Sequence, residues 1–204
     1  MTRFVMMKSR CAVLALSAAL LSGCAPVIVG GAVMGGMVAV DRRTSGAQLE
    51  DQAIELKSIS RLRELLGERG HVSVTSYNRL VLVSGEVPTE ADRGAADQAV
   101  RQIENVRATV NELAVAVNST LGSRSNDVII TSKVKASFID AKDLQSNALK
   151  VVTERSIVYL MGRVTEREAT RAAEVARSIS GVQKVVRVFE TISEAELAEM
   201  QAKK

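Results

Sequence analysis

The most specific chemistry in this sequence belongs to Cys24, which ends the run Leu21-Ser22-Gly23-Cys24. Small residues before a cysteine, after a basic start and an apolar run, are typical of the lipobox of bacterial lipoproteins. Cleavage before this cysteine would leave it as the first mature residue, diacylated on its thiol and acylated on its amine. We therefore predict a signal peptide over residues 1–23 and a lipidated, palmitate-bearing Cys24. The alternative is an ordinary secretory signal in which the cysteine stands by chance.

Few other side chains offer chemistry. His71 is the only histidine, and a lone histidine at the start of a strand is most often structural or exposed. The sequence has no metalloprotease, hydrolase or cysteine–histidine motif, and Cys11 is lost with the signal. Several carboxylates on predicted helices favour a solvated surface: Glu50, Asp51, Glu90, Asp92 and Asp97. The sequence thus predicts a protein that is not an enzyme, with no catalytic residue, no metal site and no cofactor.

Charge is distributed unequally along the chain. The full sequence has 27 Lys+Arg and 23 Asp+Glu, but three basic residues precede Cys24, which leaves 24 against 23 in the mature part. Residues 48–117 hold 8 basic and 11 acidic side chains, whereas residues 124–192 hold 12 and 8. A basic region on a lipid-anchored protein suggests attraction to anionic headgroups. The alternative is a merely solvated surface.

The elements that position these residues come as two copies of one module. An apolar strand over residues 157–162 ends at Gly162, and Thr165 and Glu168 then form a capping box for a helix. The same pattern occurs 77 positions earlier, at residues 80–85. Each copy predicts the order αββαβ, so we expect an α+β protein of two modules, each a three-stranded sheet with two helices on one face. We expect Gly85 and Gly162 to end their strands and to allow a tight turn into the next helix.

The repeat also divides the chain. We assign residues 24–47 to a lipidated tether, 48–117 to the first module, 118–124 to a polar linker, 125–192 to the second module and 193–204 to a tail with a short helix. One stripe of the first helix is predicted to face the core: Leu49, Leu56, Ile59, Leu62 and Leu65. A stripe of small residues should let the helix after Gly162 pack closely on its sheet: Ala169, Ala172, Ala173, Ala176 and Ile179.

The helix expected over residues 127–141 is apolar on two faces. At about 100° per residue, one face carries Ile130, Val134, Phe138 and Ala141, and we assign this face to the core. The second face must be covered by the first module, by a partner protein or by a membrane interface. Flanking lysines favour the membrane, because their stems can lie along apolar surface while the ammonium groups meet phosphates. The predicted lipid-binding residues are Val128, Ile129, Ser132, Lys133, Lys135, Ala136 and Ile139.

Together these features resemble the dual BON-domain outer-membrane lipoproteins of the DolP/YraP type. The resemblance rests on the lipobox, the two repeats and three runs: Asp41-Arg42-Arg43-Thr44, Ser125-Asn126-Asp127 and residues 161–169. It implies attachment to the inner, periplasmic leaflet of the outer membrane and binding of anionic, phosphatidylglycerol-like phospholipid through the second domain. It also implies enrichment at cell-division sites and a role in envelope integrity. The lipid-facing helix of the family maps onto residues 126–139, with Ile129 where the best-known member type has tryptophan.

Two functions therefore compete at the level of the sequence. The leading one is a lipid-binding lipoprotein that maintains the envelope. The alternative is a protein-interaction module that uses the same helix face to bind a regulator of cell-wall hydrolases or an outer-membrane assembly factor. We expect no nucleic acid and no small-molecule substrate. The sequence leaves open how the two modules pack, and whether that packing covers Ile129 and Ile139.

Overall fold

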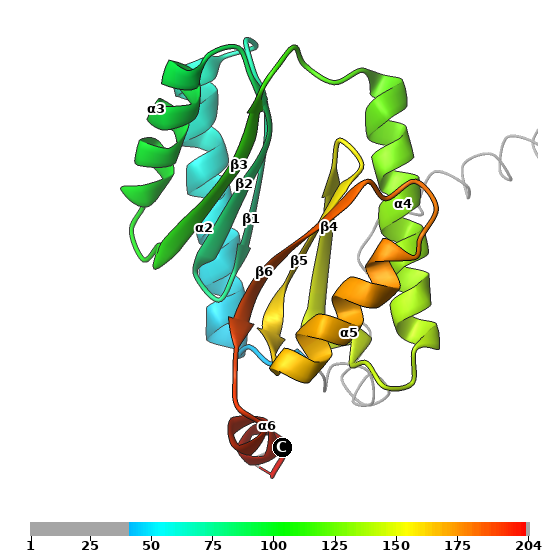
Figure 1. Cartoon of the computed structure of the whole chain (residues 1–204). Helices are drawn as coiled ribbons and strands as arrows, with labels where there is room; N and C mark the ends of the chain where they lie inside the picture. Colours follow the sequence, from blue (N-terminus) through cyan, green and yellow to red (C-terminus); the bar gives the residue numbers. More distant parts are fainter. Residues whose placement is uncertain (1–40, 203–204) are drawn as a thin grey trace, which may run out of the picture. The chain divides into compact units, whose positions relative to one another are not determined.

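The computed structural model describes residues 41–202, which form two modules in the predicted order (Figure 1). The first contains α2 (Ser45–Leu66), β1 (His71–Tyr77), β2 (Leu80–Val87), α3 (Glu90–Arg101) and β3 (Ala108–Val115). The second contains α4 (Leu121–Asp140), a 3-10 turn η1 (Ser146–Ala148), β4 (Leu149–Glu154), β5 (Ile157–Val164), α5 (Glu166–Arg177) and β6 (Lys184–Thr191). The predicted signal, Cys24 and most of the tether lie outside the described residues.

Each module has one three-stranded sheet with two helices on one face, which confirms the predicted α+β fold. The middle strand, β2 or β5, pairs antiparallel with the strand before it and parallel with the strand after the helix. In the first module Ile54, Leu62 and Leu66 of α2 pack with strand β2 and helix α3. In the second module the predicted alanines of α5 are buried against α4 and the sheet. The small side chains allow this close approach.

The two sheets pack against each other through the faces that carry no helices (Figure 1). This junction buries residues from both modules: Tyr77, Leu82, Tyr159, Met161 and Val188. The packing explains why the middle strands are apolar on both sides, because one face meets its own helices and the other meets the second sheet. The helices of the two modules consequently lie on opposite outer sides.

Gly85 and Gly162 lie inside their strands, two residues before the ends, which corrects the predicted location at a strand exit. A Cβ atom on Gly85 would stand 2.0 Å from the carbonyl oxygen of His71. On Gly162 it would stand 2.4 Å from the carbonyl oxygen of Ala148. Both glycines have positive φ, of 115° and 155°. The clash that requires glycine is therefore with the start of the neighbouring strand, and not with the turn into the helix.

Two helix predictions differ from the structure. The core face of α2 consists of Asp51, Ile54, Ser58, Leu62 and Leu66, so the predicted stripe was wrong except at Leu62. Leu49 and Leu56 are exposed on the opposite face. Helix α4 begins at Leu121, six residues before its predicted start, so residues 121–124 of the proposed linker are helical. Glycine at position 122 suggested a linker, but a glycine in the first turn of a helix is tolerated when Thr120 caps it.

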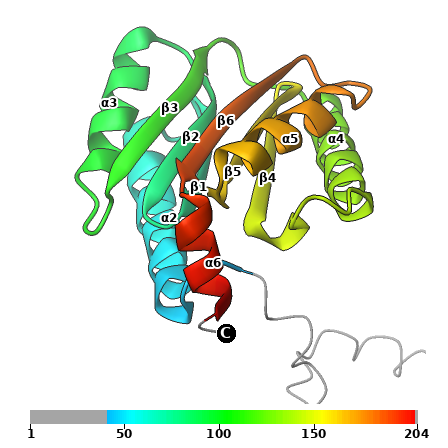
Figure 2. The same ribbon diagram turned by 60° about the horizontal axis from the view of Figure 1, so that its bottom comes forward.

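Helix α6 (Glu194–Ala202) follows β6 and lies beyond the ends of the sheets (Figure 2). Ser193 and Glu196 exchange hydrogen bonds at its start, as the predicted cap requires. Residues 39–204 form one compact unit, and the cores lie within it, so a fragment over these residues should fold by itself. Among the described helices, none has the length and apolar character needed to cross a bilayer.

Candidate functional site: the outer face of helix α4

Helix α4 is held on its module by one narrow apolar stripe. Thr120 accepts a hydrogen bond from the backbone N–H of Ser123 and so begins the helix. Ile130, Val134 and Phe138, one turn apart, are buried in the second core, as predicted. Asp127 and Thr131 add polar contacts to the hairpin of β4 and β5, and the opposite side of the helix faces outward.

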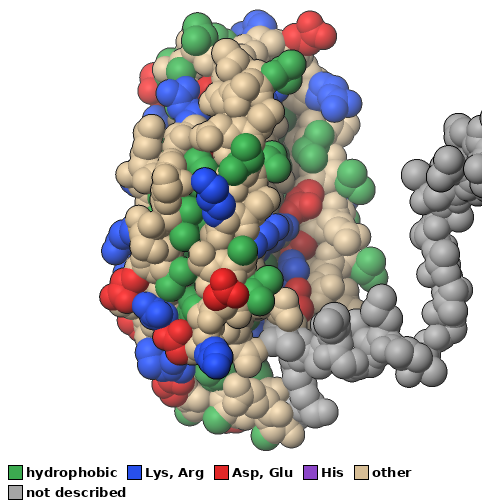
Figure 3. Space-filling view, turned by 90° about the vertical axis from the view of Figure 1, so that its right-hand side faces the viewer, with side chains coloured by type: hydrophobic (Ala, Val, Ile, Leu, Met, Phe, Trp, Pro, Cys, Tyr) green, Lys and Arg blue, Asp and Glu red, His purple; other side chains and the backbone are tan. Residues whose placement is uncertain are grey.

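The outer face of α4 is exposed, and the first module does not cover it. Every predicted lipid-binding residue is on this face: Val128, Ile129, Ser132, Lys133, Lys135, Ala136 and Ile139. Val128 and Ile139 expose 65% and 71% of their surface. Figure 3, which faces the right-hand side of Figure 1, shows hydrophobic side chains interspersed with basic ones on this side of the molecule. The structure thus brings the predicted residues together on one accessible surface.

Leu121 belongs to the same face and was missed by the sequence analysis. It precedes Val128 by seven residues, which is two helical turns, and it is 80% exposed. The apolar ridge therefore extends from Leu121 to Ile139, close to the full length of the helix. Thr120, a good N-cap residue, was the sequence signal that could have placed the helix start here.

A groove of 390 Å³ runs beside α4, between the helix and the edge strands of both sheets. Its α4 wall includes Val128, Ser132 and Lys135, and its other side includes His71 of β1 and Glu154 of β4. Figure 3 shows a furrow on this side of the molecule in which acidic and basic side chains lie together. The exposed face of α4 is thus bordered by a polar cleft between the two modules.

One buried aspartate in the second turn of each module's first helix holds a β-hairpin turn. Asp127 accepts hydrogen bonds of 2.9 and 2.8 Å from the backbone N–H groups of Arg155 and Ser156. Asp51 does the same for Asn78 and Arg79, at 2.7 and 2.8 Å. The prediction that Asp51 is solvated was therefore wrong, because it is only 2% exposed.

Residues 41–44 fasten the chain to both modules before α2 begins. Arg42 donates two hydrogen bonds of 2.7 Å to the carboxylate of Glu168 and another of 2.7 Å to the carbonyl of Arg163. Arg43 stacks 4.2 Å above the ring of Tyr77 and pairs with Asp51. Burial by itself would raise the pKa of Glu168, but the hydrogen bonds from Arg42 hold that pKa below its usual range. We call residues 41–44 the clamp segment.

The BON-domain family model matches this chain twice, at residues 51–117 and 126–192. The chain belongs to the BON-domain family. It is 35% identical over 173 residues to a protein of Haemophilus influenzae named outer membrane lipoprotein DolP, covering 83% of this chain and 89% of that one. It is 32% identical to a 21 kDa hemolysin of Actinobacillus pleuropneumoniae, covering 74% and 78%. It is 27% identical to the osmotically-inducible protein Y of Escherichia coli, covering 56% and 58%.

Polar contacts at the rim of the junction fix the two BON domains relative to each other. Glu190 of the second domain accepts hydrogen bonds from Asn78 and Arg107 of the first, at 2.6 and 3.0 Å. On the other rim, Lys150 donates to Glu55 at 2.9 Å. These contacts, the clamp segment and the apolar junction together hold α4 outward.

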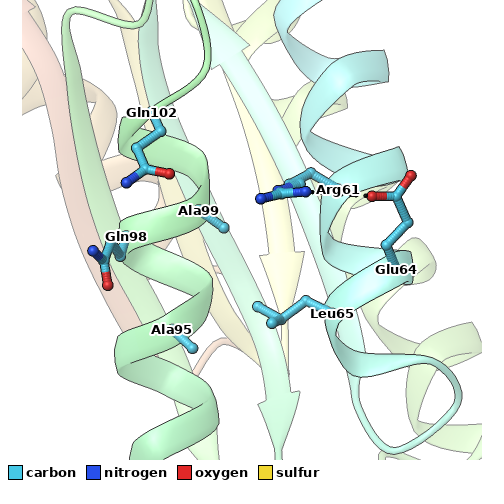
Figure 4. A pocket seen from close by; sticks show the side chains of 7 residues that line it. All are labelled: Arg61, Glu64, Leu65, Ala95, Gln98, Ala99 and Gln102. Atoms are coloured by element: carbon cyan, nitrogen blue, oxygen red, sulfur yellow. Dashed lines mark ion pairs between the residues drawn. The ribbon is translucent and has the colours of Figure 1, made fainter.

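The first BON domain has a groove of 370 Å³ between its own helices (Figure 4). Arg61 and Leu65 of α2 point across it toward Ala95 and Ala99 of α3, and Glu64 pairs with Arg61 at 3.6 Å. Gln98 and Gln102 complete the lining. The two alanines leave the space open because their side chains are too short to reach α2. This groove is a second accessible surface, but it lacks the row of exposed apolar side chains that α4 carries.

Proposed function

We propose that this chain is a periplasmic lipoprotein, anchored in the inner leaflet of the outer membrane, that binds anionic phospholipid through α4. In this proposal it performs no catalysis and supports envelope integrity at cell-division sites. The exposed face of α4 is the observation that carries the proposal. The name of the Haemophilus influenzae relative, outer membrane lipoprotein, supports the location. The family resemblance supports the role in the envelope.

The chemistry of the α4 face suits a membrane interface. Leu121, Val128, Ile129 and Ile139 would lose contact with water when the helix lies on the headgroup layer, which is favourable for apolar surface. Lys133 and Lys135 are exposed beside this ridge, and a lysine near an anionic surface contributes about 1 kcal/mol. Apolar burial and charge attraction thus act on the same helix face.

Flotation of the 39–204 fragment with vesicles tests the proposal. The fragment lacks the lipidated cysteine, so any vesicle binding must come from the folded domains. It should float with phosphatidylglycerol-containing vesicles and not with purely zwitterionic ones. Ile129→Asp and Ile139→Asp should weaken binding, because a carboxylate entering the interface is desolvated and repelled. Lys133→Glu should weaken it by about tenfold or more at low salt, and less as salt rises, because screening reduces charge attraction.

Two control variants separate surface contact from unfolding. Leu56→Asp changes a leucine of α2 that is 71% exposed, the same as Ile139, and should leave vesicle binding intact. Val134→Asp places a charge in the core and should unfold the second domain. If the fragment does not float even at low salt, the lipid proposal fails. Protein docking on the same α4 face is then the better explanation.

The anchor is tested separately in cells. Cys24→Ser should prevent lipidation and leave either uncleaved precursor or soluble protein. Fractionation of wild-type membranes should place the mature protein in the outer membrane, because Ala25, rather than aspartate, follows the cysteine. A mutant that keeps the normal mature mass and still partitions with outer membranes would disprove the lipobox assignment.

A further inference from the structure

Three metal-ligating side chains from both BON domains meet where the two sheets join. His71 opens β1, Glu86 lies beside it on β2, and Glu154 ends β4 of the second domain. One ligand atom from each residue lies within 4.8 Å of the other two. The Nδ1 atom of His71 is 3.2 Å from Oε2 of Glu86 and 3.7 Å from Oε1 of Glu154. These residues lie up to 83 positions apart in the sequence, so no short motif contains all three.

The charges of this cluster are not balanced by the described residues around it. The side chain of Glu86 is fully buried, and its Oε1 atom accepts no hydrogen bond from any described residue. The nearest cation is Arg155, whose Nη1 atom is 3.6 Å from Oε1 of Glu86. Apart from His71, this arginine is the only cationic side chain among the described residues that lies within 4.0 Å of the carboxylates of Glu86 and Glu154. Such a site favours an added cation.

The cluster is also accessible. His71 and Glu154 line the floor of the groove beside α4, together with Ser73 and Arg124. An ion can reach both ligands from solvent through this groove. Asp127, another lining residue, is occupied by the turn N–H groups of the second domain. The three cluster residues therefore provide one nitrogen and two oxygen ligands, and two of the three residues line the groove.

We propose that His71, Glu86 and Glu154 form a binding site for a divalent metal ion of the zinc type that links the two BON domains. Imidazole nitrogen with carboxylate oxygen is a ligand set that Zn²⁺ accepts, whereas Ca²⁺ and Mg²⁺ prefer oxygen alone. Ligand atoms about 2.1 Å from a tetrahedral zinc stand about 3.4 Å from one another. The two distances from His71, 3.2 and 3.7 Å, bracket that spacing. Small side-chain adjustments would complete the site.

Titration of the untagged 39–204 fragment with Zn²⁺ alone, followed by calorimetry near neutral pH, tests this site. We expect saturable binding of one ion per chain and a rise in melting temperature, because an ion that binds only the folded state stabilises it. His71→Gln and Glu154→Gln should each weaken binding by about tenfold or more. Glu174→Gln, an exposed carboxylate on α5, is the matched control and should not change it.

Nitrogen NMR of the single histidine provides a readout on the unaltered chain. Zinc should shift the Nδ1 resonance of His71, which no surface carboxylate site would do. The absence of saturable binding, or binding that persists unchanged in folded His71→Gln protein, would overturn the proposal. Zinc binding without a shift of the His71 resonance would equally exclude this cluster as the site.

Discussion

Replacing Asp127 by alanine should destabilise the second BON domain, because its carboxylate holds a hairpin turn. Its carboxylate accepts hydrogen bonds from the backbone N–H groups of Arg155 and Ser156 at 2.9 and 2.8 Å. Those two residues form the β4–β5 turn with φ angles of 54° and 61°, a left-handed conformation that favours glycine or asparagine. The aspartate therefore stabilises a turn that its own residues disfavour.

The magnitude follows from the two hydrogen bonds. Each bond to a charged acceptor contributes about 1.5–3 kcal/mol. The turn lies near the surface, so water can partly replace the acceptor, and we expect a loss of about 3 kcal/mol in the free energy of unfolding. Asp127→Asn keeps one acceptor oxygen and should cost roughly half of this amount. These losses are large against a total stability of about 5–15 kcal/mol for a typical domain.

Urea denaturation of the 39–204 fragment, followed by circular dichroism, measures this loss. Asn126→Ala is the matched control, because Asn126 is the exposed neighbour, and its cost should be below about 0.5 kcal/mol. Ser156→Gly in the Asp127→Ala background should recover about 1 kcal/mol by relieving the left-handed strain. An Asp127→Ala protein within about 1 kcal/mol of wild type would refute the assigned role of the carboxylate.

Three further predictions concern stability. Gly162→Val should lower the free energy of unfolding by about 3 kcal/mol or more in urea denaturation, because its Cβ would meet the carbonyl of Ala148 at 2.4 Å; an unchanged curve would contradict this. Arg42→Ala should cost about 3 kcal/mol by leaving Glu168 buried without its partner, whereas a loss below about 0.5 kcal/mol would show that the clamp segment is dispensable. Burial alone would raise the pKa of Asp51, but its hydrogen bonds lower that pKa below the usual value. The contribution of Asp51 to the free energy of unfolding should therefore be present above about pH 4 and disappear as the pH falls through the folded-state pKa. An Asp51→Asn variant with the same acid sensitivity as wild type in this range would refute that.

Much of the fold was predictable because it depends on local signals that recur. The αββαβ order followed from two copies of one pattern 77 residues apart, and the capping box of Thr165 and Glu168 formed as predicted. The core face of α4 was also predicted correctly, because Ile130, Val134 and Phe138 repeat at helical spacing. Periodicity failed in α2, where the polar Asp51 and Ser58 occupy the core face. The exposed leucines Leu49 and Leu56 made the opposite side of α2 look more apolar than its true core face.

The candidate site on α4 was likewise predicted only in part from the sequence. The residues of the outer α4 face could be chosen from the sequence, because their positions around one helix depend only on its geometry. Whether the face is covered depended on how the two sheets pack, and the structure leaves it exposed. Leu121 was missed because the helix start was placed too late. The lipid interaction itself stays a prediction.

The sequence by itself determined the repeat, the order of elements and the helix faces, because each arises from residues a few positions apart. Only the tertiary structure decided the contacts between distant segments. It joined Arg42 of the clamp segment to Glu168 of the second BON domain and directed the helix-free faces of both sheets against each other. It also brought His71 next to Glu154, which changes an isolated histidine into part of a buried cluster. Long-range contacts of this kind leave no periodic trace, since each residue satisfies its local pattern equally well without its partner.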